Sequence, residues 1–131
     1  MKKCLIVLLA AVLFLPPTVA GAARNHPALR PAGQVRTMKV TAYCPCRECC
    51  GPRACGITAS GRPARGKIIA APASVPFGTW ITVPGYGRAQ VLDRGGAIRG
   101  NRLDVLMPTH AKALRWGVRV LKVCVESNGG T

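Results

Sequence analysis

Acidic and aromatic residues are scarce in this sequence. Asp and Glu together number 4 among 131 residues, against 19 Lys and Arg, so the formal net charge is +15, and aromatic residues make up only 5% of the chain. A surface this basic attracts polyanions of any kind. Nucleic acid is the first polyanion to exclude, because the chain has no zinc-finger spacing, no aromatic sheet motif and no basic recognition helix. We therefore expect no nucleic-acid partner. The alternative is that the arginines only reflect genome composition and solubility.

No apolar run is long enough to span a bilayer. Lys2 and Lys3 precede an apolar run over residues 4–15, which is shorter than the ~20 residues that a membrane-spanning helix needs, and small residues follow it. This pattern predicts a secretory signal peptide over residues 1–23, with a retained N-terminal anchor as the alternative. Residues 24–34 are predicted to be a flexible linker, residues 35–127 one small domain and residues 128–131 a tail.

Export determines which partners are available. We expect the mature protein to be secreted and to reside in the cell wall or periplasm, as a monomer with no transmembrane segment after signal cleavage. The polyanions there are wall polymers, lipid head groups and the carboxylates of peptidoglycan. We expect the positive charge of the protein to bind these polyanions, above all peptidoglycan glycan strands and other anionic wall polymers.

Six cysteines remain after the predicted cleavage. An even number in a small exported domain favours disulfides, so we predict no free thiol and a bond from the last cysteine back to the cluster formed by the first five. The alternative is a thiolate metal site, because the C-x-C-x-x-C-C spacing is similar to that of zinc sites. We favour disulfides and expect no metal and no cofactor. The six residues are Cys44, Cys46, Cys49, Cys50, Cys55 and Cys124.

Short apolar segments separated by Gly and Pro predict a compact β-barrel. A single helix is predicted over residues 110–116, with Thr109 as its N-cap and Gly117 as its C-terminal stop. The predicted strands cover residues 35–43, 68–71, 79–83, 88–93, 103–106 and 118–125.

Two of the chain's four acidic residues lie eleven positions apart, with arginines and a glycine-rich loop between them. Asp93 and Asp104 each follow a leucine, and the loop is suited to returning the chain beside itself. Facing side chains on paired strands approach to roughly 5 Å, which would let both carboxylates address one sugar ring. Two carboxylates at such a range suit glycosidic chemistry. Alternatively, each aspartate bonds loop amides or pairs with an arginine.

Five further residues are candidates for substrate contact. Thr58 and Ser60 offer hydroxyls to a sugar, or only cap a loop. Tyr43 is placed either to stack on a sugar ring or to pack in the core. Gly95 and Gly96 would let substrate approach the backbone, or form a plain turn.

Six segments of the sequence, taken in their order along the chain, resemble the three-aspartate, or 3D, domain over roughly residues 37–125. That family is similar to the catalytic barrel of membrane-bound lytic transglycosylase A and to stationary-phase muralytic proteins. The resemblance implies a mainly β fold, a small six-stranded double-psi β-barrel with one or two short helices. It also implies that peptidoglycan glycan strands are cleaved without water, leaving a 1,6-anhydro end on muramic acid. The segments are VTAYCPCRECCG (40–51), GITASGRPARGKIIAAP (56–72), VPFGT (75–79), VPGYG (83–87), DRGGAIRGNRLDV (93–105) and HAKALRWG (110–117).

The resemblance also assigns roles. It maps Asp104 to the acid/base and Asp93 to its supporting neighbour, whereas Ala71 stands where the family has its first aspartate. A lytic mechanism works with a single acid/base, so the expected function is a peptidoglycan lytic transglycosylase. The alternative is a non-catalytic module on the same barrel that binds peptidoglycan or loosens the wall.

Overall fold

The computed structural model describes residues 33–126. The predicted signal peptide, most of the predicted linker and the predicted tail lie outside the described residues. The strand expected at residue 35 begins at Gly33, two residues inside the segment assigned to the linker. In the described part of the chain, no helix combines the length and the hydropathy needed to cross a membrane.

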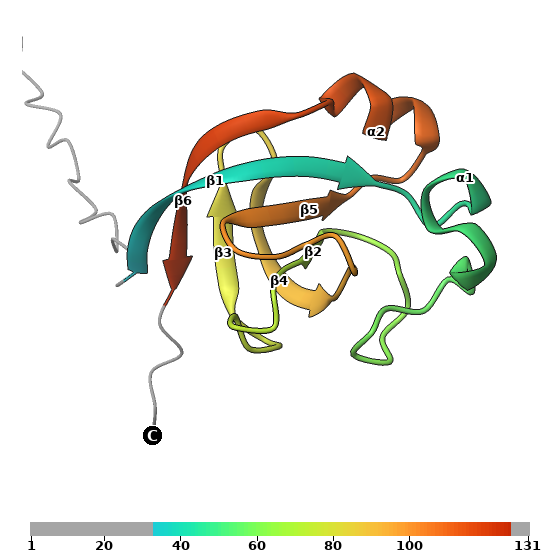
Figure 1. Ribbon diagram of the computed structural model, residues 1–131, viewed down its shortest axis with the longest axis horizontal. Coiled ribbons are helices and arrows are strands. Elements are labelled where there is room, and N and C mark those ends of the chain that lie inside the picture. The colour runs from blue at the N-terminus through green and yellow to red at the C-terminus, as the bar shows by residue number, and fades with distance from the viewer. Residues whose placement is uncertain (1–32, 127–131) are drawn as a thin grey trace, which may run out of the picture.

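Six strands close into a barrel in the order β1-β5-β2-β4-β3-β6 (Figure 1). The pairs β1–β5 and β2–β4 are parallel, and the other four pairs are antiparallel. The prediction of a small, mainly β, six-stranded barrel is confirmed, and each observed strand overlaps one predicted segment. The strands are β1 (Gly33–Tyr43), β2 (Ile68–Ala70), β3 (Trp80–Val83), β4 (Gly87–Asp93), β5 (Arg102–Leu106) and β6 (Arg119–Glu126).

Two short α-helices lie outside the barrel wall. The predicted helix α2 (His110–Trp116) forms as expected, because the Thr109 side chain accepts a hydrogen bond from the Lys112 amide and Gly117 takes the positive φ of 64° that ends the helix. The helix α1 (Arg47–Cys50) and the 3-10 turn η1 (Gly51–Arg53) were not predicted. Both lie in the segment that contains the first five cysteines of the predicted mature chain, for which neither a helix nor a strand was predicted.

Alternate residues of the strands fill the barrel. Val40, Ile69, Val91 and Leu103 are fully buried, and their sequence neighbours point to the other face of each strand. Trp116 of α2 covers one part of the barrel, and its indole N–H donates to the Val40 carbonyl at 3.4 Å. The side chains of β1, β2, β4 and β5 that face away from the core are therefore available to form a site on the barrel wall.

Candidate functional site

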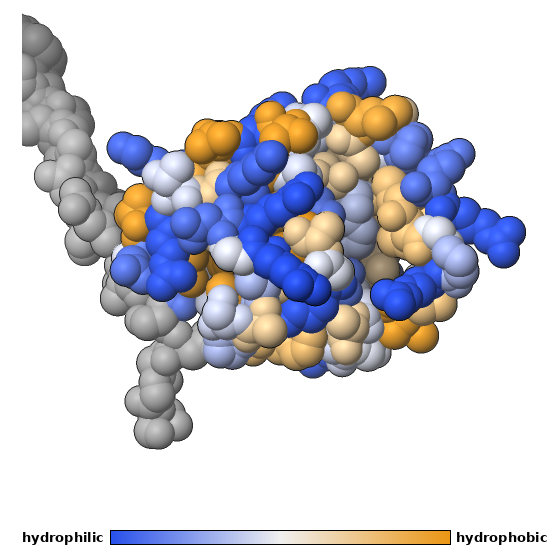
Figure 2. Space-filling model, viewed as in Figure 1, coloured by the Kyte–Doolittle hydropathy of each residue, from blue (hydrophilic) through white to orange (hydrophobic). Residues whose placement is uncertain are grey.

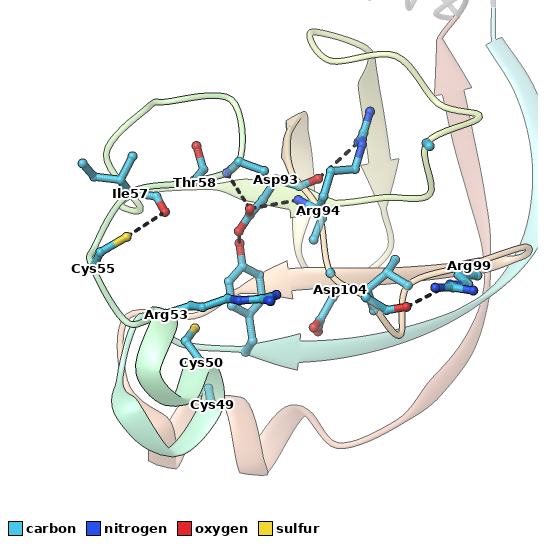
Figure 3. A pocket seen from close by; sticks show the side chains of 17 residues that line it. Cys49, Cys50, Arg53, Cys55, Ile57, Thr58, Asp93, Arg94, Arg99 and Asp104 are labelled. Atoms are coloured by element: carbon cyan, nitrogen blue, oxygen red, sulfur yellow. Dashed lines mark hydrogen bonds between the residues drawn. The ribbon is translucent and has the colours of Figure 1, made fainter.

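The main cavity lies between the barrel wall and the segment that follows β1. Its volume is about 990 Å³, at the upper end of the range of small-molecule sites. One wall is the outer face of the barrel with the loop after β4, and the other is formed by residues 49–59 (Figure 3). Asp93 and Asp104 both line this cavity, together with Tyr43, Thr58, Gly95 and Gly96. The structure therefore brings six of the seven catalytic and substrate-binding candidates to one cavity.

The two carboxylates do not sit on adjacent strands. Ala70 of β2 lies between them, as the partner of Asp104 on β5 on one side and of Asp93 on β4 on the other. At about 4.8 Å per strand, the two Cα atoms are about 10 Å apart rather than facing each other directly. The prediction that the glycine-rich loop returns the chain beside itself was therefore wrong, because β2 inserts between β4 and β5.

A β-bulge turns Asp93 towards the site. Ala89 and Val91 face the core, so strict alternation would send Asp93 there as well. Instead the register of β2 with β4 shifts between Ile69 and Ala70, which places Asp93 opposite Ala70. Bulges re-aim side chains in this way beside functional sites. The shift puts Asp93 on the same face as Asp104.

Asp104 is a half-buried carboxyl with few polar partners. Leu103 and Val105 on either side face the core, so the Asp104 side chain points outward into the cavity. Thr41 donates a hydrogen bond to its Oδ1 at 3.0 Å. Burial raises the pKa of Asp104 to about 6, and it outweighs the Thr41 hydrogen bond and the positive charge of Arg102, which lower it. A carboxyl with this pKa holds its proton at mildly acidic pH.

Asp93 is instead held by three donors. The Tyr43 hydroxyl donates to Oδ2 at 2.5 Å, while the amides of Ala59 and Arg94 donate to Oδ1 at 2.8 and 2.9 Å. These contacts tie β1, the 56–66 loop and β4 to one carboxylate. Burial and the neighbouring Asp93 raise the pKa of Tyr43, so its phenol keeps its proton and stays a donor. The two carboxylates therefore differ: Asp93 is held by three hydrogen bonds, whereas Asp104 accepts one from a side chain and has a raised pKa.

Of the remaining candidates, Thr58 and Ser60 stabilise a loop beside the cavity, and the two glycines form part of its rim. The Thr58 side chain is buried and bonds the carbonyl and amide of Arg62 at 3.0 and 3.2 Å, so it closes the 58–62 loop. Ser60 bonds Thr58 at 3.1 Å and is absent from the cavity lining, which leaves it a loop residue. Gly95 and Gly96 form an exposed rim, and a Cβ on Gly96 would meet nothing within 4 Å. The backbone at Gly96 is therefore open to the cavity.

The sequence did not single out the basic residues of the cavity. Arg53 and Arg99 are exposed and line it from opposite walls. Arg94 also lines it, but its guanidinium donates to the Val75 carbonyl at 2.6 Å and stacks over Phe77 at 4.0 Å, which gives it a structural role. Arg99 Nε also donates to the Gly96 carbonyl at 3.0 Å. The sequence does not show that Arg53 and Arg99 line one cavity, because the two walls come from segments far apart in the chain. Figure 2 shows hydrophilic residues at the left, centre and right of the visible face, with hydrophobic residues between them.

Ala71 packs in the barrel core instead of the cavity. Its side chain is fully buried within the apolar cluster, whereas its neighbour Ala70 lines the cavity. Its amide donates to the Asp93 carbonyl at 3.3 Å and its carbonyl accepts from Arg94 at 3.2 Å. The backbone of this residue supports the site, but its side chain has no access to it.

The expected disulfides do not form in this structure. All six cysteines among the described residues are free thiols. The predicted bond from Cys124 to the cluster was wrong, because Cys124 pairs with Val35 near the start of β1, whereas Cys44 follows its end. Nine residues of extended strand span on the order of 30 Å, and a disulfide needs Cα atoms within about 7 Å. Three thiols of the cluster instead gather around His110.

The comparisons with known proteins identify a family. Residues 67–125 match the 3D domain. In Bacillus subtilis (strain 168), "Putative cell wall shaping protein YabE" is 38% identical over 92 residues, which cover 70% of this chain and 23% of that protein. "Cell wall-binding protein YocH" of the same organism is 41% identical over 75 residues, which cover 53% of this chain and 26% of that protein. The chain thus spans about a quarter of the length of these relatives.

A solved structure has the same fold. The "Streptomyces papain inhibitor (SPI)" superposes with a TM-score of 0.53 at 22% identity, covering 74% of this chain and 98% of that one. At this level of identity the likeness shows the architecture alone. The barrel itself therefore does not determine what the cavity does.

Proposed function

Because this chain carries a 3D domain over residues 67–125, we propose that it acts on the cell wall as a peptidoglycan lytic transglycosylase with Asp104 as its acid/base. The observation that carries the proposal is the half-buried Asp104 carboxyl, whose pKa is raised to about 6 on the wall of a cavity of about 990 Å³. A general acid needs its pKa near the working pH. The names of the two relatives, which refer to shaping and binding of the cell wall, support the substrate class.

The reaction requires one proton to leave Asp104 and one to return. Protonated Asp104 donates to the glycosidic oxygen as the bond from that oxygen to the anomeric carbon of muramic acid breaks. The resulting carboxylate accepts the proton of the sugar's own 6-hydroxyl, whose oxygen bonds to the anomeric carbon. No water is consumed, and Asp104 ends protonated as it began. Asp93, fixed by its three donors, supplies negative charge where the ring develops positive charge.

A second candidate function is wall binding without cleavage. The sequence favours it in one respect, because Ala71 stands where the family resemblance implies an aspartate, and the buried Ala71 leaves the cavity lined by two carboxylates, Asp93 and Asp104. In that case the cavity and its two exposed arginines would hold the glycan strand, and Asp104 would only contribute a hydrogen bond.

Incubation of purified peptidoglycan sacculi with the protein separates the two functions. We expect soluble muropeptides to accumulate, measured by chromatography, while a parallel pelleting assay measures binding. Binding without release at any pH between about 4 and 8 would contradict the enzyme and support the binding module.

The pH dependence of cleavage should follow Asp104. Because its pKa is raised to about 6, the proton needed for the first step is present below that value and lost above it. We expect kcat/KM to fall about tenfold per pH unit above the pKa. Initial rates on sacculi across a pH series at constant ionic strength test this. A rate that stays level from about pH 5 to 8 would exclude Asp104 as the acid.

The two exposed arginines of the cavity should contribute to wall binding. Arg53→Ala and Arg99→Ala each remove one exposed charge, and Arg99→Ala also removes the hydrogen bond that Arg99 donates to the Gly96 carbonyl. For each variant we expect a loss of affinity of about 2- to 5-fold that shrinks as salt rises. Arg115→Ala is the matched control, because Arg115 is exposed on α2 and absent from the cavity lining. Pelleting assays at low and high salt measure the difference. Equal losses in all three variants would show that binding depends on total charge only.

A further inference from the structure

Three thiols and one imidazole converge beside the cavity, at a point that the proposed reaction does not use. The Sγ atoms of Cys44, Cys46 and Cys49 and a ring nitrogen of His110 all lie within 4.8 Å of one another. Cys44 follows β1, Cys46 and Cys49 belong to the turn that forms α1, and His110 is the first residue of α2. Residues more than 60 positions apart in sequence thus meet at one point.

The spacing of these four atoms suits tetrahedral coordination. Zinc bonds of about 2.3 Å to sulfur and 2.1 Å to nitrogen require ligand atoms about 3.5–3.8 Å apart. His110 Nδ1 lies 3.9, 3.8 and 3.3 Å from the sulfurs of Cys44, Cys46 and Cys49, and the sulfurs of Cys44 and Cys49 are 3.3 Å apart. The sulfurs of Cys44 and Cys46, 2.6 Å apart, need to separate by about 1 Å to bind the ion.

The chemistry of the set favours zinc. Three soft thiolates and one imidazole, with no open position, form a Cys3His structural site. The neighbouring thiols do not join it, because Cys50 points to the Cys44 carbonyl at 3.2 Å and Cys55 to the Ile57 carbonyl at 3.6 Å. We propose that Cys44, Cys46, Cys49 and His110 bind one zinc ion, which fastens the turn after β1 to the start of α2.

The site would stabilise one wall of the cavity. Cys49 and Cys50 line the cavity, and the same segment continues to Arg53 and Cys55. The helix α1 is only four residues long and buries none of its residues, so apolar packing contributes little to its position. A metal ion that joins α1 to α2 supplies this missing constraint. The inference does not depend on glycan cleavage.

Metal analysis of the reduced, full-length protein tests the proposal. After addition of zinc and gel filtration under reducing conditions, we expect one zinc per chain by elemental mass spectrometry. Cobalt in place of zinc should give the visible absorption of a tetrahedral ion and a near-ultraviolet thiolate charge-transfer band. Cys49→Ser and His110→Ala should each weaken zinc binding at least about 100-fold, because loss of an outer-shell partner alone costs 10–100-fold.

Three further variants keep the test decisive. Cys55→Ser and Cys124→Ser are matched controls that should retain one zinc, and His110→Cys should restore binding as a Cys4 site with an altered cobalt spectrum. Absence of stoichiometric zinc in the reduced wild-type protein would overturn the proposal. Equal zinc loss in Cys49→Ser and Cys55→Ser would also overturn it, as would zinc binding unaffected by His110→Ala.

Discussion

Asp104→Asn should reduce glycan-strand cleavage by about 10²- to 10⁴-fold, the range typical for loss of a general acid/base. Asparagine keeps the size of the side chain and can still accept the hydrogen bond from Thr41, but it has no proton to transfer. Binding to sacculi should survive the change. Initial rates of muropeptide release, measured with a pelleting assay on the same preparations, give both quantities.

Asp93→Asn is the matched comparison. It should reduce the cleavage rate less than Asp104→Asn does, because Asp93 is proposed to support Asp104 and to supply negative charge.

The pH dependence of stability provides the control for folding. The folded state binds the Asp104 proton more tightly than the unfolded chain, because its pKa is raised from 3.8 to about 6. The stabilisation from Asp104 is therefore present at low pH and lost as pH rises through that window. The difference between the Tm of Asp104→Asn and that of the wild type should therefore rise from about pH 4 to 7. A variant that is inactive because it is unfolded would show no such change.

Ala71→Asp should destabilise the barrel by about 3–5 kcal/mol, instead of restoring a third site carboxylate. Ala71 is fully buried in the apolar cluster, so the new carboxyl would have to lose its hydration without a partner. Thermal unfolding should show Tm lowered by more than about 10 °C. The loss should be greater at pH 7 than at pH 4, because burial favours the neutral carboxyl.

Ala73→Asp is the matched control, because Ala73 is exposed and lines the cavity two residues further on. We expect its Tm to stay close to that of the wild type. If Ala71→Asp unfolds at the wild-type temperature and cleaves faster near neutral pH, residue 71 does face the site. The packing described for β2 would then be wrong.

The strands could be predicted from sequence because their signals are local. Alternation around Val91 and Leu103 and turn residues such as Gly85 mark strand positions without knowledge of the partner strand. The caps of α2 were likewise local, since Thr109 and Gly117 flank the helix directly. These features depend on residues within a few positions of one another.

The site could be predicted only in part, because its geometry depends on how distant strands pair. Asp93 and Asp104 were identified from the scarcity of acidic residues, from the glycine-rich loop between them and from the family resemblance. Nothing in their spacing shows that β2 separates them. The bulge that turns Asp93 outward leaves no mark in the sequence. Burial around Asp104, which decides whether its pKa lies high or low, likewise follows from the assembled barrel.

The cysteines illustrate the same limit. Their even number in a predicted exported chain favoured disulfides, whereas the structure places three of them against His110, more than 60 residues away. Sequence spacing showed the C-x-C-x-x-C part of this cluster, but not its fourth member.

Mass spectrometry of muropeptides released in ¹⁸O-labelled water tests the central claim most directly. If the Asp104 carboxylate accepts the proton of the sugar's own 6-hydroxyl, the products carry 1,6-anhydromuramic acid. They contain no ¹⁸O, because no water enters the reaction. Products with reducing ends that contain ¹⁸O would identify a hydrolase and contradict the proposed mechanism. Absence of any released muropeptide from sacculi that bind the protein would contradict catalysis itself.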